Sequence, residues 1–98
     1  MTTRKYVIEE VEVIPIKPKD GLIGFASLVF EKSFYFGCIG IYTRLGGGYR
    51  LTYPIKQAGK GTMNVFHPIN PEVSKQLEEA VGNKYEEIMM MSLDMTEE

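Results

Sequence analysis

The sequence predicts an α+β domain in which an antiparallel β-meander is followed by one C-terminal helix. Up to residue 66, short runs rich in Val, Ile, Phe and Tyr are separated by Gly, Pro and Asp turn signals, which is typical of strands joined by tight turns. After residue 70, the apolar residues recur at the period of an amphipathic helix. The length of 98 residues fits one domain, so we expect residues 1–98 to form a single unit.

Four to five strands are expected in chain order. In the first, Glu10 to Val13 alternate polar and apolar. Because proline cannot donate to the ladder, this strand is expected either to lie at a sheet edge or to end at Pro15. Asp20-Gly21 tolerates positive φ and forms the first turn. Residues 55–62 are expected to form an exposed basic loop. The expected strands cover residues 6–16, 22–31, 34–44, 49–53 and 63–66.

A helix is predicted from about residue 71 to residue 91. Asn70 suits the N-cap, and Pro71 suits the first helical position, where its missing N–H costs nothing. Gly82 is expected to weaken the middle of the helix by roughly 1 kcal/mol relative to alanine. We expect the tail at residues 94–98 to be frayed. The apolar positions that share one helical face are Val73, Leu77, Ala80, Val81, Ile88 and Met91.

Both faces of the second and third strands are apolar. Strict alternation places Leu22, Ala26, Leu28 and Phe30 opposite Ile23, Phe25 and Val29, and Phe34, Phe36 and Cys38 opposite Tyr35, Ile39 and Ile41. One helix covers one face only, and monomers rarely expose a large apolar patch. A symmetric homodimer is therefore predicted. We expect the methionines of residues 89–91 to pack at the dimer seam.

The acidic residues avoid the middle of the chain. No Asp or Glu lies between Glu31 and Glu72, and this segment carries a charge of +5, whereas the first 31 residues carry −1 and the last 27 carry −6, for a net charge of −2. Such a segment can attract phosphates, and the nearby tyrosines either stack on bases or pack in the core; they are Tyr42, Tyr49 and Tyr53. The alternative is a cationic sheet balanced by the acidic helix. The candidate nucleic-acid-binding residues are Arg44, Arg50, Lys56 and Lys60.

The side chains that could support catalysis or metal binding are few. His67 is the only histidine and Cys38 the only cysteine, so neither a nucleophile with its base nor a zinc site within one protomer is expected. We expect His67 to be structural, with its ring hydrogen-bonded across a strand-to-helix junction that comprises His67, Pro68, Asn70 and Pro71. Gly46-Gly47-Gly48 is read as a hairpin turn. No enzyme activity, cofactor or metal is therefore predicted.

The N-terminal residues do not resemble a signal peptide, because Glu9, Glu10 and Glu12 interrupt the apolar run. No stretch approaches the roughly 20 apolar residues of a membrane-spanning helix. We therefore expect a cytoplasmic protein that does not interact with membranes.

The segment Val65-Phe66-His67-Pro68-Ile69-Asn70, followed by a helix, resembles the stage V sporulation protein G (SpoVG, septation protein) family. Further matches are Asp20-Gly21, Ala26-Ser27 and Ala80-Val81 with Tyr85, so the resemblance covers about residues 6–88. It implies a small cytoplasmic bacterial protein that dimerises and regulates septation, sporulation or cell division, in a family of which several members bind DNA or RNA.

Two functions follow from these observations. The first is a non-enzymatic regulatory protein that binds DNA or RNA as a homodimer through the basic middle segment. The alternative is a dimeric protein-interaction module, favoured by the acidic last third of the chain and by Pro54-Ile55-Lys56-Gln57, which carries one basic residue where family members often have two.

Overall fold

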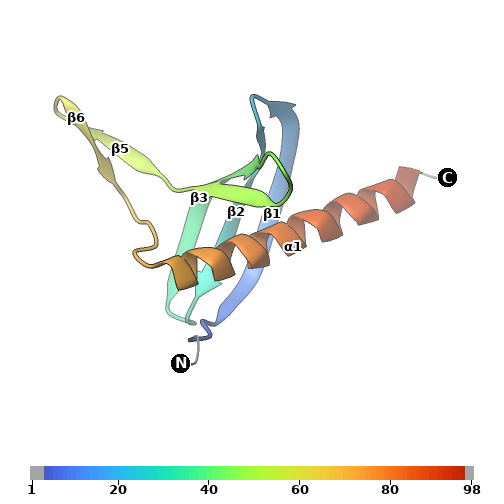
Figure 1. Cartoon of the computed structure of the whole chain (residues 1–98), viewed down its shortest axis with the longest axis horizontal. Coiled ribbons are helices and arrows are strands. Elements are labelled where there is room, and N and C mark those ends of the chain that lie inside the picture. Colours follow the sequence, from blue (N-terminus) through green and yellow to red (C-terminus); the bar gives the residue numbers. More distant parts are fainter. Residues whose placement is uncertain (1–3, 97–98) are drawn as a thin grey trace.

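A computed structural model describes residues 4–96 of the chain, with side chains up to residue 91. It contains a four-stranded antiparallel sheet in the order β1-β2-β3-β4, a separate two-stranded hairpin of β5 and β6, and one C-terminal helix (Figure 1). The predicted α+β meander with a C-terminal helix is therefore confirmed. The elements are β1 (Ile8–Lys19), β2 (Leu22–Phe30), β3 (Phe34–Thr43), β4 (Tyr49–Thr52), β5 (Ile55–Ala58), β6 (Gly61–Asn64) and α1 (Pro71–Thr96).

The core lies between α1 and one face of the four-stranded sheet, because α1 crosses the sheet and packs against β1 and β4 (Figure 1). Leu28, Ile39, Ile41 and Val81 are fully buried there. Leu77 and Val73 lie one and two turns before Val81 on the same helical face, as the sequence period predicts. The amphipathic stripe of α1 therefore provides one side of the core, and the sheet provides the other.

Bulges in the strands overturn the strict alternation expected from the sequence. In β3, Ile39 pairs with Ala26 while Phe36 pairs with Leu28, so two residues of β3 face one residue of β2, and Cys38 adopts a φ of +59° there. The extra residue reverses the alternation, which brings Phe36 and Ile39 to the same face.

The same happens in the first two strands. Glu10, with φ of +49°, lies in a bulge of β1 that brings Ile8 and Val11 to the same face. Ile23, which was expected to lie opposite Leu28, joins the buried core beside a register shift between β2 and β3.

The opposite face of the sheet is not covered by α1. It exposes Ile14, Phe25 and Tyr35, whose exposed fractions are 68%, 42% and 73%. We call this surface the outer face. Pro15 lies in β1 at the edge of the sheet, as predicted, and β1 continues past it to Lys19 rather than ending there.

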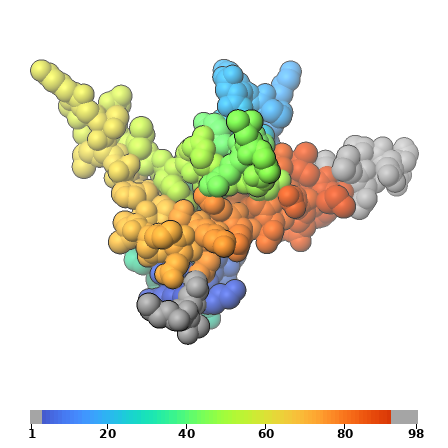
Figure 2. All heavy atoms as spheres, in the orientation of Figure 1, coloured from blue at the N-terminus to red at the C-terminus, as the bar shows by residue number. Residues whose placement is uncertain are grey.

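The segment expected to be a basic loop is instead part of a hairpin. Residues 55–58 form β5 and pair with β6, which covers residues 61–64 rather than 63–66. A two-residue turn joins the strands, and Gly59 adopts the positive φ of +60° that glycine tolerates best. We call residues 55–64 the arm. Every residue of the arm is exposed, and the arm stands clear of the body of the molecule (Figure 2).

The helix is longer than expected. It continues to Thr96, so the prediction of a frayed tail is wrong for residues 94–96, while residues 97 and 98 lie outside the described part. Neither glycine nor proline occurs after Met91 to end the helix earlier. Within residues 4–96, the helix is not apolar enough over its length to cross a bilayer.

Gly82 has a packing role that the sequence did not reveal. A Cβ atom at this position would lie 2.7 Å from Cδ2 of the Tyr49 ring, which packs against α1 and contacts Tyr85 at a centroid distance of 5.5 Å. The Tyr49 hydroxyl also donates to Glu86 Oε2 at 3.1 Å, so the ring is held from two sides. Glycine at this position therefore lets β4 approach the helix.

Gly82→Ala is expected to destabilise the fold by about 1 kcal/mol. The overpacking cost of about 1–3 kcal/mol exceeds the propensity gain of about 1 kcal/mol that alanine brings to a helix. Chemical denaturation would measure the change. Asn83→Ala is the matched control, because Asn83 is exposed and alanine there should be neutral or slightly stabilising. A more stable Gly82→Ala protein would show that Tyr49 does not pack closely on the helix.

Candidate nucleic-acid interface

The arm brings two of the four predicted basic residues together. Lys56 lies on β5 and Lys60 in the turn at the tip, and both are exposed. Residues 55–64 contain no Asp or Glu. The ion pairs found within the described side chains, residues 4–91, do not include either lysine. Both ammonium groups are therefore available to an anionic ligand.

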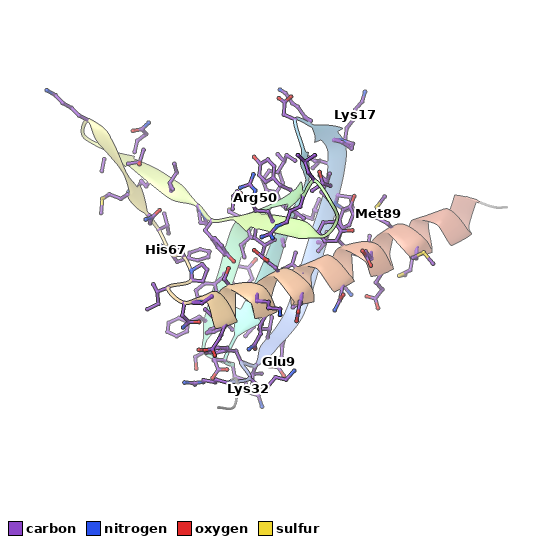
Figure 3. All side chains as sticks on the ribbon, viewed as in Figure 1. Glu9, Lys17, Lys32, Arg50, His67 and Met89 are labelled. Carbon is purple, nitrogen blue, oxygen red and sulfur yellow. The ribbon has the colours of Figure 1, made fainter. Side chains whose placement is uncertain are left out.

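Arg50 lies elsewhere, on the outer face of β4. Its guanidinium carbon lies 4.8 Å from the centroid of the Tyr42 ring, and the two residues are cross-strand partners in β3 and β4. This cation–π contact orients the side chain over an aromatic ring while leaving the residue exposed. Figure 3 places Arg50 in the middle of the molecule, away from the tip of the arm. Arg50 and Tyr42 thus form a second candidate contact site, separate from the lysines of the arm, that combines a cation with an aromatic ring.

Arg44 is neutralised within the fold. Its Nη2 atom donates to Glu78 Oε2 of α1 at 3.0 Å, and the arginine side chain is about half exposed. An exposed pair of this kind contributes at most about 1 kcal/mol to stability. Its larger effect here is that one of the four predicted cations already has a carboxylate partner. The reading in which the acidic helix balances the basic sheet therefore applies to Arg44.

The predicted basic residues consequently lie in three places rather than in one patch. Lys56 and Lys60 are on the arm, Arg50 is on the outer face, and Arg44 is on the loop beside α1. The tyrosines also separate. Tyr49 packs on the helix and Tyr53 packs edge-on against Phe66, so neither is free to stack on a base. Of the three tyrosines proposed for stacking, Tyr42 is the one beside an exposed arginine.

Burial sets the ionisation of the two packed tyrosines. Burial raises the pKa of Tyr53 to about 12, with a smaller contribution from the negative charge of Glu78. Burial also raises the pKa of Tyr49, and its hydrogen bond to the Glu86 carboxylate acts in the same direction. Both phenols therefore stay protonated at neutral pH.

The junction between the arm and the helix is built as predicted in one respect and not in another. Asn70 Oδ1 accepts a hydrogen bond from the Val73 N–H at 2.8 Å, which confirms the N-cap, and Pro71 is the first residue of α1. The His67 ring is exposed and forms no side-chain hydrogen bond within residues 4–91, so the bond expected across the corner is not found. Figure 3 places His67 where the chain returns from the arm toward α1.

The backbone pairing of the arm continues one step beyond β5 and β6. The Val65 N–H donates to the Pro54 carbonyl at 3.1 Å, which extends the pairing of β5 and β6 by one step toward the sheet. The arm therefore projects from the molecule as a paired hairpin that carries two exposed lysines.

Between residues 4 and 91, no group of three or more His, Cys, Asp and Glu side chains is placed to hold a metal ion.

Comparison with known proteins agrees with this architecture. The SpoVG family model matches residues 6–87, which is most of the chain. The chain is also similar to a putative septation protein SpoVG of Phytoplasma australiense, with 28% identity over 83 residues that cover 84% of this chain and 85% of that protein. The match includes the sheet, the arm and the junction, and it extends through most of the helix. The chain belongs to the SpoVG family.

Proposed function

We propose that this chain is a non-enzymatic regulatory protein of the SpoVG type that binds DNA or RNA as a homodimer through the arm. The observation that carries the proposal is the arm itself, which carries Lys56 and Lys60, contains no Asp or Glu, and stands clear of the sheet and helix (Figure 2). Local positive charge steers association even when the net charge of the protein is −2. Arg50 on Tyr42 provides a second phosphate or base contact, and Arg44 contributes when Glu78 releases it.

A salt titration of binding to single- and double-stranded oligonucleotides tests this function. Each phosphate contact releases about 0.7–0.9 counterion, so a dimer that engages about six phosphates should lose roughly a thousandfold in affinity between 50 and 200 mM salt. Little dependence on base sequence is expected, because lysine contacts to phosphate carry no sequence information. Absence of binding at low salt would exclude the proposal and favour a protein-interaction module, for which the Arg44–Glu78 pair and the acidic helix are the support.

We propose that the homodimer forms through the part of the outer face that belongs to β1, β2 and the start of β3, so that Arg50 on the edge strand β4 stays accessible to nucleic acid. Ile14, Phe25 and Tyr35 make this face apolar, and α1 covers only the other side of the sheet. Burial of such a patch against its own copy gives a closed, symmetric contact.

Light scattering is expected to give twice the chain mass of 11.1 kDa at micromolar concentration. Ile14→Asp should give a monomer, because it would place an unpaired charge in the contact. Ile69→Asp is the matched control, since Ile69 is exposed at the helix junction. A monomeric unmutated protein, or a dimer that Ile14→Asp leaves intact, would contradict this interface.

A further inference from the structure

The arm is a two-stranded ribbon with solvent on both of its faces. β5 and β6 form a sheet of their own, and every residue of the arm is exposed (Figure 2). An isolated hairpin is only marginally stable in water unless another surface packs on it. The arm therefore offers both faces of a ribbon to a ligand that can surround it.

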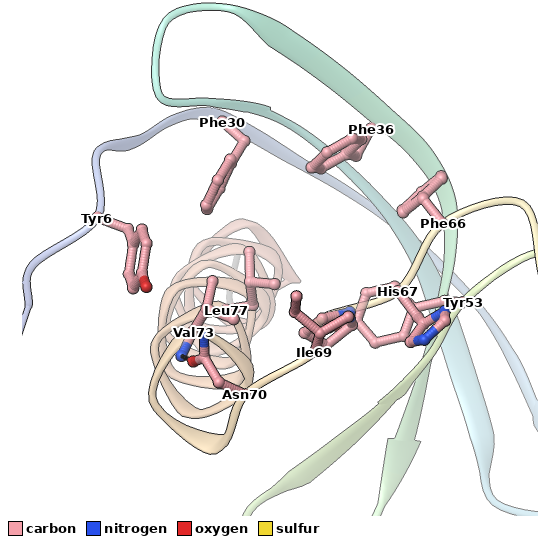
Figure 4. A pocket seen from close by; sticks show the side chains of 11 residues that line it. Tyr6, Phe30, Phe36, Tyr53, Phe66, His67, Ile69, Asn70, Val73 and Leu77 are labelled. Carbon is pink, nitrogen blue, oxygen red and sulfur yellow. Dashed lines mark hydrogen bonds between the residues drawn. The ribbon is translucent and has the colours of Figure 1, made fainter.

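Aromatic packing holds the root of the arm against the sheet. Tyr53 lies two residues before β5 and Phe66 two residues after β6, so the two rings flank the ribbon. Phe66 stacks on Phe36 of β3 with ring centroids 4.5 Å apart, and Tyr53 packs edge-on against Phe66 at 6.0 Å (Figure 4). Packing at the root therefore sets the direction in which the ribbon projects.

One face of the ribbon carries uncharged polar side chains. Cross-strand partners share a face, and the pairs on this face are Ile55–Asn64 and Gln57–Thr62. Amide and hydroxyl groups both donate and accept hydrogen bonds. The side-chain hydrogen bonds found within residues 4–91 do not involve Gln57, Thr62 or Asn64. These three residues, which we call the polar face, are therefore available to a ligand.

The lysines of the arm lie outside the polar face. Lys56 pairs with Met63 on the opposite face, and Lys60 lies in the turn at the tip. A lysine ammonium group sits on a flexible four-carbon stem, so it can turn toward charges on either side of the ribbon. Neutral polar groups flanked by cations suit a nucleic-acid groove, in which base edges lie between two phosphate backbones.

The size of the ribbon selects one groove. Each strand of the arm has four residues, which at about 3.3 Å per residue gives about 13 Å of length, and paired strands lie about 4.8 Å apart. The major groove of B-form DNA, about 12 Å wide and about 8.5 Å deep, admits a two-stranded ribbon, whereas the minor groove is about 6 Å wide. The major groove of A-form RNA is deep and too narrow for side chains to read. Of these grooves, the major groove of B-form DNA is the one that admits the arm.

We propose that the arm enters the major groove of B-form duplex DNA, with the polar face toward the base edges and Lys56 and Lys60 on the flanking phosphates. The proposal rests on nucleic-acid binding by the arm and specifies the class of nucleic acid. Every base pair presents both donor and acceptor groups in this groove, so amide and hydroxyl groups find partners on any sequence. The polar face therefore adds affinity for duplex DNA with little dependence on base sequence.

Three ligands of one mixed sequence test the proposal: a short DNA duplex, the corresponding RNA duplex and the single DNA strand. Each carries the same fluorescent label, and anisotropy gives its affinity for the full chain at one salt concentration. The two duplexes have the same number of phosphates, so a difference between them reports the groove. The DNA duplex is expected to bind about tenfold more tightly than the RNA duplex, because it gains the hydrogen bonds of the polar face.

Two modified DNA duplexes identify the groove. Glucosylated 5-hydroxymethylcytosine in place of cytosine adds a bulky, neutral group to the major groove, and 2,6-diaminopurine in place of adenine adds an amino group to the minor groove. Glucosylation is expected to remove the advantage of the DNA duplex over the RNA duplex. Diaminopurine is expected to leave the affinity unchanged.

Gln57→Val combined with Asn64→Val removes two amides from the polar face and keeps the ribbon, because valine favours strands. This variant should lose the preference for the DNA duplex, while its salt slope stays unchanged because no phosphate contact is lost. Met63→Val, on the opposite face, is the matched control and should keep the preference.

Three results would overturn the proposal and leave nucleic-acid binding by the arm intact. They are equal or tighter binding of the RNA duplex or the single strand, full affinity for the glucosylated duplex, and a preference for the DNA duplex that survives Gln57→Val with Asn64→Val. Absence of binding to all three ligands would instead contradict the proposed function itself.

Discussion

Replacing Lys56 and Lys60 together with glutamine, which removes four cations from a homodimer, is expected to weaken nucleic-acid binding by more than about a thousandfold at ~0.1 M salt. The two lysines are the exposed cations of the arm, and each phosphate contact that is lost removes about 0.9 from the salt slope on duplex DNA. Glutamine preserves a polar side chain on a hairpin whose residues are all exposed, so the fold should not change. Fluorescence anisotropy with a labelled oligonucleotide would measure both the affinity and the slope.

A matched pair on the helix controls for net charge. Lys75→Gln with Lys84→Gln removes the same two charges from α1, where Lys84 already pairs with Glu87 at 3.0 Å. Binding by this variant should fall much less than binding by the arm variant. Equal losses from the two pairs would move the contacts from the arm to the helix or reduce them to a general effect of charge.

Ile39→Ala is expected to destabilise the fold by about 2–5 kcal/mol, the range for truncating a buried aliphatic side chain without collapse of the cavity. Ile39 is fully buried between the sheet and α1, and the bulge at Cys38 places it on the same face of β3 as Phe36. Urea denaturation would give the free energy of unfolding.

Ile69→Ala is the matched control for this change. The Ile69 side chain is 87% exposed, so its truncation should change stability by no more than about 0.5 kcal/mol. A loss for Ile39→Ala as small as that for Ile69→Ala would mean that Ile39 points away from the core that Phe36 contacts; strict alternation had placed these two residues on opposite faces.

The sequence was sufficient to predict those features of the structure that depend on a few neighbouring residues. Asn70 and Pro71 predicted where the helix begins, because a cap and a first-turn proline act within four residues. Pro15 predicted an edge strand from its missing N–H. The family was recognised from the His-Pro-Ile-Asn junction, which is also local.

The sequence was insufficient where the structure depends on neighbouring strands or on distant segments. The bulges at Glu10 and Cys38 place non-glycine residues at positive φ, and no residue type there indicates this. The strand of residues 55–58 has little apolar alternation, so the arm was read as a loop.

The candidate site shows the same limit. The Arg44–Glu78 pair joins residues 34 positions apart in the chain. Charge counting identified Arg44 as a candidate cation but could not show that α1 provides its counter-ion. For the same reason, it grouped four cations that the fold separates.

The most direct test of the central claim is an amide NMR titration of the full chain with an unlabelled single-stranded oligonucleotide at low salt. If the arm is the contact surface, the largest shifts fall within residues 55–64, with smaller shifts around Arg50, and they disappear as salt is raised. Shifts confined to α1 and the outer face, with residues 55–64 unchanged at saturation, would contradict the account.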